Sequence, residues 1–343
     1  MKAIVYTQYG PPDMLQLKEI ATPSPADNEV LIKIYAASVN PLDCHFMRGK
    51  PLFLRLMGGL RTPKHKILGC DIAGRVEAVG RNVKQFQPGD EVFGAGKGLG
   101  GFAEYVCTVE DKLAQKPANI SFEEAAAIPV AAISALQGLR DKGRIQRGRK
   151  VLVDGASGGV GTFAVQIAKS FGAEVTAVCS TRNLDTARSI GADHVIDYTR
   201  EDFTRSGQRY DLILAANAYH SIFDYRRALS QDGSYVMVGG GWAQIFQAIL
   251  LGPLLSLLGS KKMCFVGAKI NNKDLVLLKD LLEAGKIVPV VDRRFPLSDV
   301  AEALRYLEEG HAQGKVVITV EHGSDTSQAL LKRPIFGSKY LTR

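Results

Sequence analysis

A glycine-rich turn between a predicted strand and a predicted helix is the strongest chemical signal in the sequence. The strand Val151–Asp154 leads into Gly-Ala-Ser-Gly-Gly-Val-Gly at positions 155–161, and the following pattern predicts an amphipathic helix over Val160–Phe171. In such a unit Gly158 lets the backbone approach a pyrophosphate at the helix N-terminus. Gly161 lets the helix pack closely on the strand.

The turn departs from the usual GxGxxG pattern, because Ala156 stands where the first glycine is expected. A tight strand–helix turn without a ligand is therefore the alternative. We interpret the turn as a dinucleotide site because the next predicted strand ends, about 20 residues on, where a cofactor-selecting residue is expected. The candidate cofactor residues of the turn are Ala156, Ser157, Gly158, Gly159, Val160 and Gly161.

The residues after that next strand, Val175–Cys179, predict which cofactor binds. Ser180-Thr181-Arg182 follows it, with no acid before Asp185. An acidic residue would hold a ribose 2′-hydroxyl, whereas hydroxyls and a guanidinium suit a 2′-phosphate. We therefore predict NADPH rather than NADH. The alternative for Arg182 is a solvated residue at the start of a helix, without a role in cofactor binding. The further candidate cofactor residues are Tyr198, Asn217 and Gly239, at the ends of later strands, and Lys315.

The elements that position these residues fall into two groups, as expected for 343 residues. Short β runs precede residue 110 and predict a compact β domain: Lys2–Thr7, Leu15–Ile20, Val30–Val39, Asp71–Val79, Glu91–Gly94 and Phe102–Val109. From Lys150 strands alternate with helices, which predicts a parallel sheet covered on both faces. Its further strands are His194–Tyr198, Asp211–Ala216 and Ser234–Gly239.

Four further segments complete the predicted elements. A capping box at Ser121 begins an alanine-rich helix toward Leu139. Val288–Val291 is a last strand of the parallel sheet or the exit from it, and Ser298–Glu309 is a helix. Lys315–Val320 is a β run that rejoins the first domain.

Charge and cysteine usage exclude several classes of protein. The net charge of +8 is concentrated in residues 48–66, with six cations and no acid, and in the tail, so a nucleic-acid-binding face is not expected. Five widely spaced cysteines without a CxxC pair exclude a disulfide scaffold and a zinc lobe built on three cysteines. Because the N-terminus lacks an apolar signal core and the cysteines are unpaired, we predict a cytoplasmic location.

Ordered motifs along residues 1–322 resemble one family. They are Asn40-Pro-Leu-Asp43, Gly69-Cys-Asp71-Ile-Ala-Gly74, Gly89-Asp-Glu-Val92, Gly100-Gly-Phe-Ala-Glu-Tyr105, Ala156–Gly161 and Gly314-Lys-Val-Val317. They resemble the zinc-free quinone oxidoreductase branch of the medium-chain dehydrogenase/reductase superfamily, and the group of the chloroplast-envelope quinone oxidoreductase homologue within it. The resemblance implies an α/β protein with a GroES-like catalytic domain (1–121 and 297–322) and a Rossmann NADPH-binding domain (122–296). The residues beyond the resemblance, 323–343, are a basic tail by their charge.

The resemblance also allows the metal site to be examined position by position. The positions that match zinc ligands of zinc-dependent relatives are Asn40, Cys70 with Asp71, and Val130, which cannot form a three-ligand catalytic zinc site. We therefore predict no metal. Without a Lewis acid, electron-poor acceptors such as quinones or activated alkenes are favoured over alcohols. Asn40 would orient the acceptor oxygen, and Asp43 follows it as a second catalytic candidate; a turn dipeptide and a helix cap are the alternatives.

The sequence thus predicts a metal-free, NADPH-dependent reductase of quinones or α,β-unsaturated carbonyl compounds. An enone or enoyl reductase with little quinone activity, or a non-catalytic NADPH-binding scaffold or sensor, are the alternatives. The basic segment 48–66 and a predicted apolar helix, Trp242–Leu258, suggest an amphipathic acceptor or contact with a membrane surface. Phe265–Ala268 resembles the edge strand through which relatives pair, so a homodimer is expected.

Overall fold

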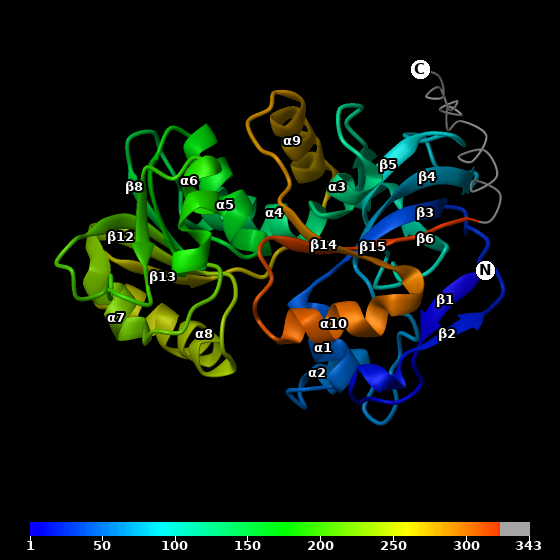
Figure 1. Ribbon diagram of the computed structural model, residues 1–343, viewed down its shortest axis with the longest axis horizontal. Helices are drawn as coiled ribbons and strands as arrows, with labels where there is room; N and C mark the ends of the chain where they lie inside the picture. The colour runs from blue at the N-terminus through cyan, green and yellow to red at the C-terminus, as the bar shows by residue number, and fades with distance from the viewer. Residues whose placement is uncertain (323–343) are drawn as a thin grey trace, which may run out of the picture.

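Two units lie side by side in the computed structural model, which describes residues 1–322 (Figure 1). The predicted basic tail, 323–343, lies outside the described residues. One unit holds a mainly antiparallel sheet, whose strand order is β14-β15-β3-β4-β5-β7, with β6 pairing with β3. Its elements are β1 (Lys2–Val5), β2 (Gln16–Glu19), β3 (Glu29–Val39), α1 (Pro41–Arg48), α2 (Leu54–Gly58), β4 (Asp71–Val79), β5 (Glu91–Ala95), β6 (Tyr105–Val109), β7 (Leu113–Gln115), β14 (Val291–Pro296), α10 (Val300–Glu308) and β15 (Lys315–Thr319).

The other unit holds a six-stranded parallel sheet in the order β10-β9-β8-β11-β12-β13, the order of a doubly wound dinucleotide-binding fold. Its elements are α3 (Phe122–Ala126), α4 (Pro129–Gln137), β8 (Lys150–Asp154), α5 (Gly159–Ser170), β9 (Glu174–Cys179), α6 (Leu184–Ser189), β10 (His194–Asp197), β11 (Tyr210–Ala215), α7 (Ile222–Ala228), β12 (Leu229–Met237), α8 (Trp242–Leu257), β13 (Lys262–Phe265) and α9 (Asn272–Glu283).

Both faces of the parallel sheet are buried, as its near-continuous apolar strands require. Val151 and Val153 of β8 pack in a core shared with α4, α5 and α9, whereas Leu152 between them packs in a second core with α7 and α8. The antiparallel sheet has its own core, which includes Ile72 and Val316. The predicted fold class, a GroES-like β domain with a Rossmann domain, is confirmed.

Three predicted elements differ in the structure. The helix expected from Ser121 to Leu139 is divided into α3 and α4, with Pro129 as the first residue of α4. Residues 288–290 form no strand and are the exit from the parallel sheet, because β14 pairs with β15 in the other sheet. We therefore propose a domain boundary near residue 290 rather than 296.

The predicted pairing strand Phe265–Ala268 is also displaced. One edge of the parallel sheet is β13, which ends at Phe265, and residues 266–268 after it are not in a strand. The apolar helix is confirmed as α8, over Trp242–Leu257. Within residues 1–322, no helix is long and apolar enough to cross a membrane.

Candidate active site

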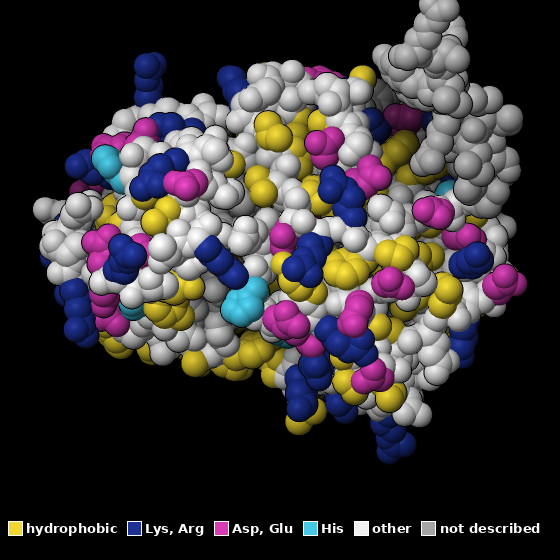
Figure 2. Space-filling model, viewed as in Figure 1, with side chains coloured by type: hydrophobic (Ala, Val, Ile, Leu, Met, Phe, Trp, Pro, Cys, Tyr) yellow, Lys and Arg dark blue, Asp and Glu magenta, His cyan; other side chains and the backbone are white. Residues whose placement is uncertain are grey.

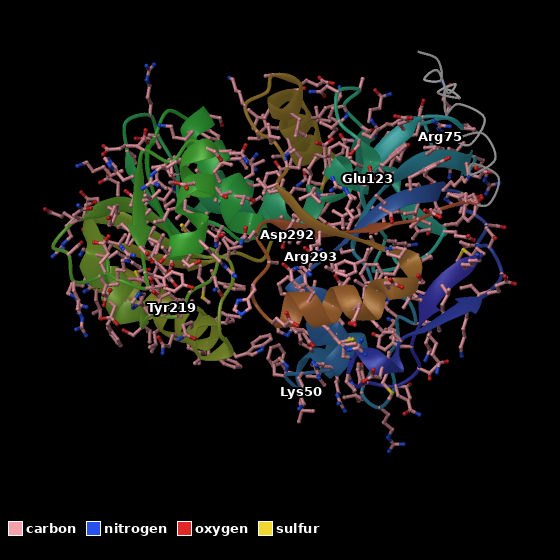
Figure 3. All side chains as sticks on the ribbon, viewed as in Figure 1. Lys50, Arg75, Glu123, Tyr219, Asp292 and Arg293 are labelled. Atoms are coloured by element: carbon pink, nitrogen blue, oxygen red, sulfur yellow. The ribbon has the colours of Figure 1, made fainter. Side chains whose placement is uncertain are left out.

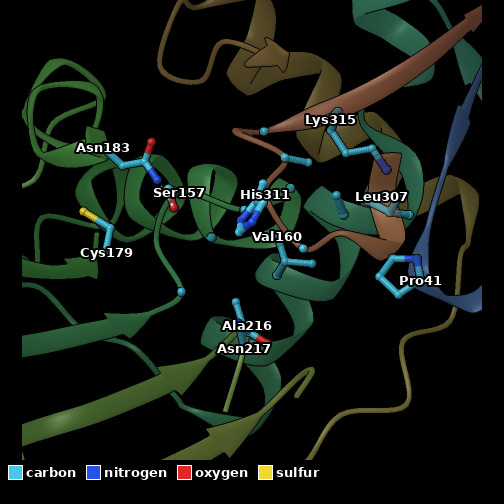
Figure 4. A pocket seen from close by; sticks show the side chains of 18 of the residues that line it. Pro41, Ser157, Val160, Cys179, Asn183, Ala216, Asn217, Leu307, His311 and Lys315 are labelled. Carbon is cyan, nitrogen blue, oxygen red and sulfur yellow. Dashed lines mark hydrogen bonds between the residues drawn. The ribbon is translucent and has the colours of Figure 1, made fainter. Parts of the chain in front are cut away.

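A cleft of about 290 Å³ opens between the two units, at the carboxyl ends of β8 and β9 (Figure 4). The turn after β8 forms one wall, and Asn40 and Pro41 at the start of α1 form the other. The segment 310–314 crosses between them. Asp292 on β14, labelled at the junction of the units in Figure 3, holds this segment by accepting hydrogen bonds from Gln313 N at 2.9 Å and Tyr306 OH at 2.7 Å.

Three of the four glycines of the turn have different roles. Gly155 has a φ of +80°, which favours glycine, and a side chain there would meet Asn217. A Cβ at Gly161 would lie 2.1 Å from the carbonyl oxygen of Gly155, so only glycine lets α5 pack on the turn. A Cβ at Gly158 would meet only that oxygen, at 3.7 Å, so packing does not explain the glycine there.

The start of α5 fits a bound pyrophosphate. Gly158 is the N-cap residue and has no side chain that could occupy the amide groups of the first turn. The missing Cβ at Gly158 leaves space in front of these amides, and the dipole of the twelve-residue helix favours an anion there. The residues of the turn therefore fit the diphosphate of an NAD(P)H cofactor.

The far end of the cleft would hold the adenosine. Ser180, Arg182 and Tyr198 line it, and Arg182 Nη2 donates to the carbonyl oxygen of His311 at 3.1 Å. Thr181 does not line the cleft, because its hydroxyl donates to Asp197 Oδ2 at 2.5 Å. This hydrogen bond, with those from Thr199, holds the pKa of Asp197 below its usual range.

Asn183 lines the same end and was not among the predicted site residues. Its Nδ2 donates to Ser157 Oγ at 3.0 Å and to Ser180 Oγ at 3.2 Å. These hydrogen bonds join the turn after β8 to the residue that follows β9 (Figure 4). Asn183 Oδ1 is buried and has no hydrogen-bond partner among the described residues. This oxygen is therefore an acceptor that the described protein groups leave unused.

The near end of the cleft is built on a buried ion pair. Lys315 Nζ donates to Asn40 Oδ1 at 2.7 Å and lies 3.3 Å from Asp71 Oδ2; Lys315 is 3% exposed and Asp71 0%. Asp71 Oδ2 also accepts from Ser38 Oγ at 2.8 Å and from Asn40 Nδ2 at 2.9 Å, while its Oδ1 accepts from Val130 N at 2.9 Å. The carboxylate is saturated with donors.

These contacts decide how well the site fits zinc. The positions that match zinc ligands, Asn40, Asp71 and Val130, do converge, but the cation between them is the ammonium group of Lys315. Burial raises the pKa of the Cys70 thiol, which opposes the thiolate form that binds metal. Residues 1–322 contain no cluster of three His, Cys, Asp or Glu side chains that could hold an ion. The donor set does not fit a catalytic zinc.

The structure separates the predicted site residues into two groups. Those that line the cleft are Asn40, Ser157, Gly158, Gly159, Val160, Gly161, Ser180, Arg182, Tyr198, Asn217 and Lys315. Ala156, Thr181 and Gly239 do not, because Ala156 is fully buried in the core and Gly239 is hydrogen-bonded to β11 and Ala218 at its strand exit.

Asp43 does not line the cleft either. It is fully buried, and its carboxylate accepts from Asn40 N at 2.8 Å and from Gly69 N at 3.0 Å. Burial raises the pKa of Asp43 to about 7. The helix-cap alternative describes this residue, which fixes the start of α1 and with it the backbone of Asn40.

Comparisons with known proteins identify the family. Two family models match, the alcohol dehydrogenase GroES-like domain over residues 26–118 and zinc-binding dehydrogenase over residues 190–318. A 2-methylene-furan-3-one reductase from Solanum lycopersicum is 37% identical, over 93% of this chain and 79% of that protein. A chloroplast envelope quinone oxidoreductase homolog from Arabidopsis thaliana is 34% identical, over 93% and 98%.

The solved structures agree with this assignment. The quinone oxidoreductase from Coxiella burnetii superposes with a TM-score of 0.82 at 31% identity, over 94% of this chain and 99% of that one. The nucleotide turn, the two-unit architecture and these likenesses make the chain an NAD(P)H-dependent oxidoreductase. It belongs to the quinone oxidoreductase-like branch of the medium-chain dehydrogenase/reductase superfamily.

Proposed function

We propose that this protein is an NADPH-dependent reductase that transfers a hydride to quinones or α,β-unsaturated carbonyl compounds without a metal. One observation carries the proposal: a single cleft joins the anion-binding turn at Gly158 to the buried cation of Lys315. The names of the two kinds of relative, an enone reductase and quinone oxidoreductases, support the two acceptor classes.

When bound, the nicotinamide supplies the hydride. Asn40 and Lys315 then act on the acceptor, because both line the cleft and negative charge develops on the acceptor oxygen during reduction. Asn40 Nδ2 has a second hydrogen beyond the one given to Asp71, and the hydrogen bond from Lys315 to Oδ1 fixes the amide plane. Lys315 adds a positive charge that needs no rearrangement during the reaction.

No step in this scheme uses a carboxylic acid as proton donor. Asp43 is enclosed by two backbone amides and Asp71 is saturated with donors. We therefore assign the proton that completes the reduced oxygen or carbon to water or to a cofactor hydroxyl. This assignment distinguishes the site from one that needs a fixed general acid.

The preference for NADPH rests on Arg182 and Ser180 at the adenosine end, where no acidic side chain lines the cleft among the described residues. Both acceptor classes stay in the proposal, with an enone or enoyl reductase of little quinone activity as the narrower form. A non-catalytic NADPH-binding scaffold or sensor is the alternative of a different class.

The deciding experiment measures NADPH oxidation by the full chain after metal stripping, with a simple quinone, a short enone and a long-chain enone carboxylate. Products are identified for each acceptor, and NADH serves as the control cofactor. Turnover that is unaffected by chelator supports the proposal, and the acceptor ranking separates quinone from enone reduction. Tight NADPH binding without turnover of any acceptor would favour the scaffold or sensor.

Assembly and location are parts of the same proposal. We propose a homodimer formed through the edge strand β13, which sedimentation velocity would test. We retain the cytoplasm as the proposed location. Several relatives carry chloroplast or mitochondrial names, so an organelle is the alternative, and fractionation of the source cells decides between them.

A further inference from the structure

Exposed apolar side chains gather on two helices at one edge of the molecule. We define them as the apolar patch, which consists of Leu52, Phe53, Leu56, Met57 and Leu60 around α2 and Phe246, Ile249, Leu250, Leu254, Leu257 and Leu258 on α8. Leu56 is 73% exposed and Leu257 82%. Figure 2 shows yellow side chains along the lower edge, where Figure 1 places α2 and α8. A monomeric protein rarely exposes so continuous an apolar surface without a partner for it.

The helix α8 places its apolar residues outward at helical spacing. Positions 246, 249, 250, 253, 254 and 257 fall on one face, and all of them are exposed. The opposite face packs on the core through Ala248 and Gly252. Between Asp232 and Lys261 the sequence holds no charged residue. The solvent-facing side of a surface helix is normally polar, but in α8 it is apolar.

Aromatic contacts join the two helices into one surface, although they belong to different units. The ring of Trp242, at the start of α8, lies 5.7 Å from Phe53 and 4.9 Å from His45 between centroids. Phe53 also lies 6.1 Å from Phe246. The patch thus adjoins α1, whose first residue, Pro41, lines the active-site cleft.

Cations flank both parts of the patch in the chain, and we call Lys50, Arg61, Lys64, Lys66, Arg226 and Lys261 its basic rim. Lys50, Arg61, Lys64 and Lys66 are exposed and form no ion pair with another described residue; Figure 3 labels Lys50 at the same lower edge. At the far end of α8, Arg226 Nη2 lies 3.4 Å from Leu258 O and Lys261 Nζ donates to Arg226 O at 2.8 Å. Residues 48–66 contain no acid.

We propose that the apolar patch and its basic rim dock this protein on an anionic lipid surface, with α8 lying in the plane of the interface. The apolar face would enter the acyl boundary while the cations contact the headgroups. A second copy of the chain fits the patch less well. A two-fold contact through the patch would bring the basic rim of one copy close to the basic rim of the other. This like-charge contact is unfavourable.

The test is flotation of the full chain with vesicles of phosphatidylcholine alone or with 30% phosphatidylglycerol, at low and high salt. We expect strong binding to the anionic vesicles only, and weaker binding as salt rises. Because a lysine or arginine near such a surface contributes about 1 kcal/mol, Arg61→Gln with Lys64→Gln should lower the partition coefficient by about 30-fold. Lys18→Gln with Lys84→Gln removes the same charge elsewhere and should change it by less than about twofold.

A second pair of variants tests the apolar part. Leu254→Glu with Leu257→Glu places charges on the exposed face of α8 and should abolish vesicle binding, whereas Leu17→Glu on β2 should not. Circular dichroism and NADPH binding verify that each variant is folded. Absence of binding by the unmodified chain, or equal binding to neutral vesicles, overturns the proposal. A dimer that the α8 variant separates, without vesicle binding, would assign the patch to a second copy and also overturn it.

Discussion

Replacement of Lys315 by methionine tests whether the buried cation at the cleft holds the GroES-like unit together. The variant keeps an unbranched apolar side chain of nearly the same length but leaves Asp71, which is 0% exposed, without a counter-charge. Loss of one partner from a buried ion pair costs about 3–5 kcal/mol of unfolding free energy. At roughly 2–4 °C per kcal/mol for a domain of this size, the Tm should fall by roughly 6–20 °C.

A double-mutant cycle separates the pair from general packing. With Asp71→Asn added, the buried carboxylate no longer needs a counter-charge, so the double variant should recover roughly 1–3 kcal/mol relative to Lys315→Met alone. Lys97→Met is the matched control. Lys97 forms an ion pair with Glu29, but its side chain is 63% exposed. That exposed pair should contribute less than about 1 kcal/mol.

The assay is thermal and urea unfolding followed by far-ultraviolet circular dichroism, at equal protein concentration and pH. Two results would refute the reasoning. The first is that Lys315→Met lowers the unfolding free energy no more than Lys97→Met does. The Lys315–Asp71 pair would then contribute no more than an exposed ion pair. The second is full additivity of the Asp71 and Lys315 substitutions, because contacting charges must couple.

Three further predictions concern the nucleotide unit. Burial raises the pKa of Asp154 to about 7, so ionisation of Asp154 destabilises the folded state progressively from about pH 4 to pH 7. Asp154→Asn should therefore raise the Tm at pH 8, by the equivalent of up to about 4 kcal/mol of unfolding free energy. At pH 4 it should not raise the Tm. Gly158→Ala should keep the Tm and raise the NADPH dissociation constant at least about tenfold, whereas Gly161→Ala should lower both the Tm and the affinity, as calorimetry and titration would measure. Arg182→Ala should weaken NADPH binding by about 10–150-fold and leave NADH unchanged.

Each of these has an outcome against it. An equal Tm gain for Asp154→Asn at both pH values would mean that the carboxylate is not penalised by burial. Equal effects of alanine at Gly158 and Gly161 would remove the distinction between ligand space and helix packing. A parallel loss of NADH binding at Arg182→Ala would place the arginine away from the 2′-phosphate.

The sequence was most informative where a local pattern decides the structure. Asp71–Val79 follows from β alternation, and Trp242–Leu257 follows from an uncharged apolar run that stays helical through Gly252 and Pro253. The glycine turn follows from its place between a strand and a helix. The roles of Gly158 and Gly161 could be separated only after the neighbours of their missing Cβ atoms were known.

Long-range contacts account for what was not predicted. Asp71 and Lys315 are 244 positions apart, and nothing in either neighbourhood indicates that they pair. The hydroxyl of Thr181 was expected to face a phosphate, but Asp197 from the next strand accepts its hydrogen bond. Residues 288–291 are as apolar as a buried strand, and Pro289 and the pairing of β14 with β15 place them outside the parallel sheet.

The pairing of β15 with β3 has a consequence for how the molecule is made on the ribosome. Residues 36–39 of β3 find their antiparallel partners at positions 316–319, so the N-terminal unit stays open while the whole nucleotide unit is synthesised. During that interval the edge of β3 is unpaired and the carboxylate of Asp71 lacks its cation. The unit synthesised first is therefore completed last, and its closure by residues 291–319 covers a strand edge through which nascent chains can associate.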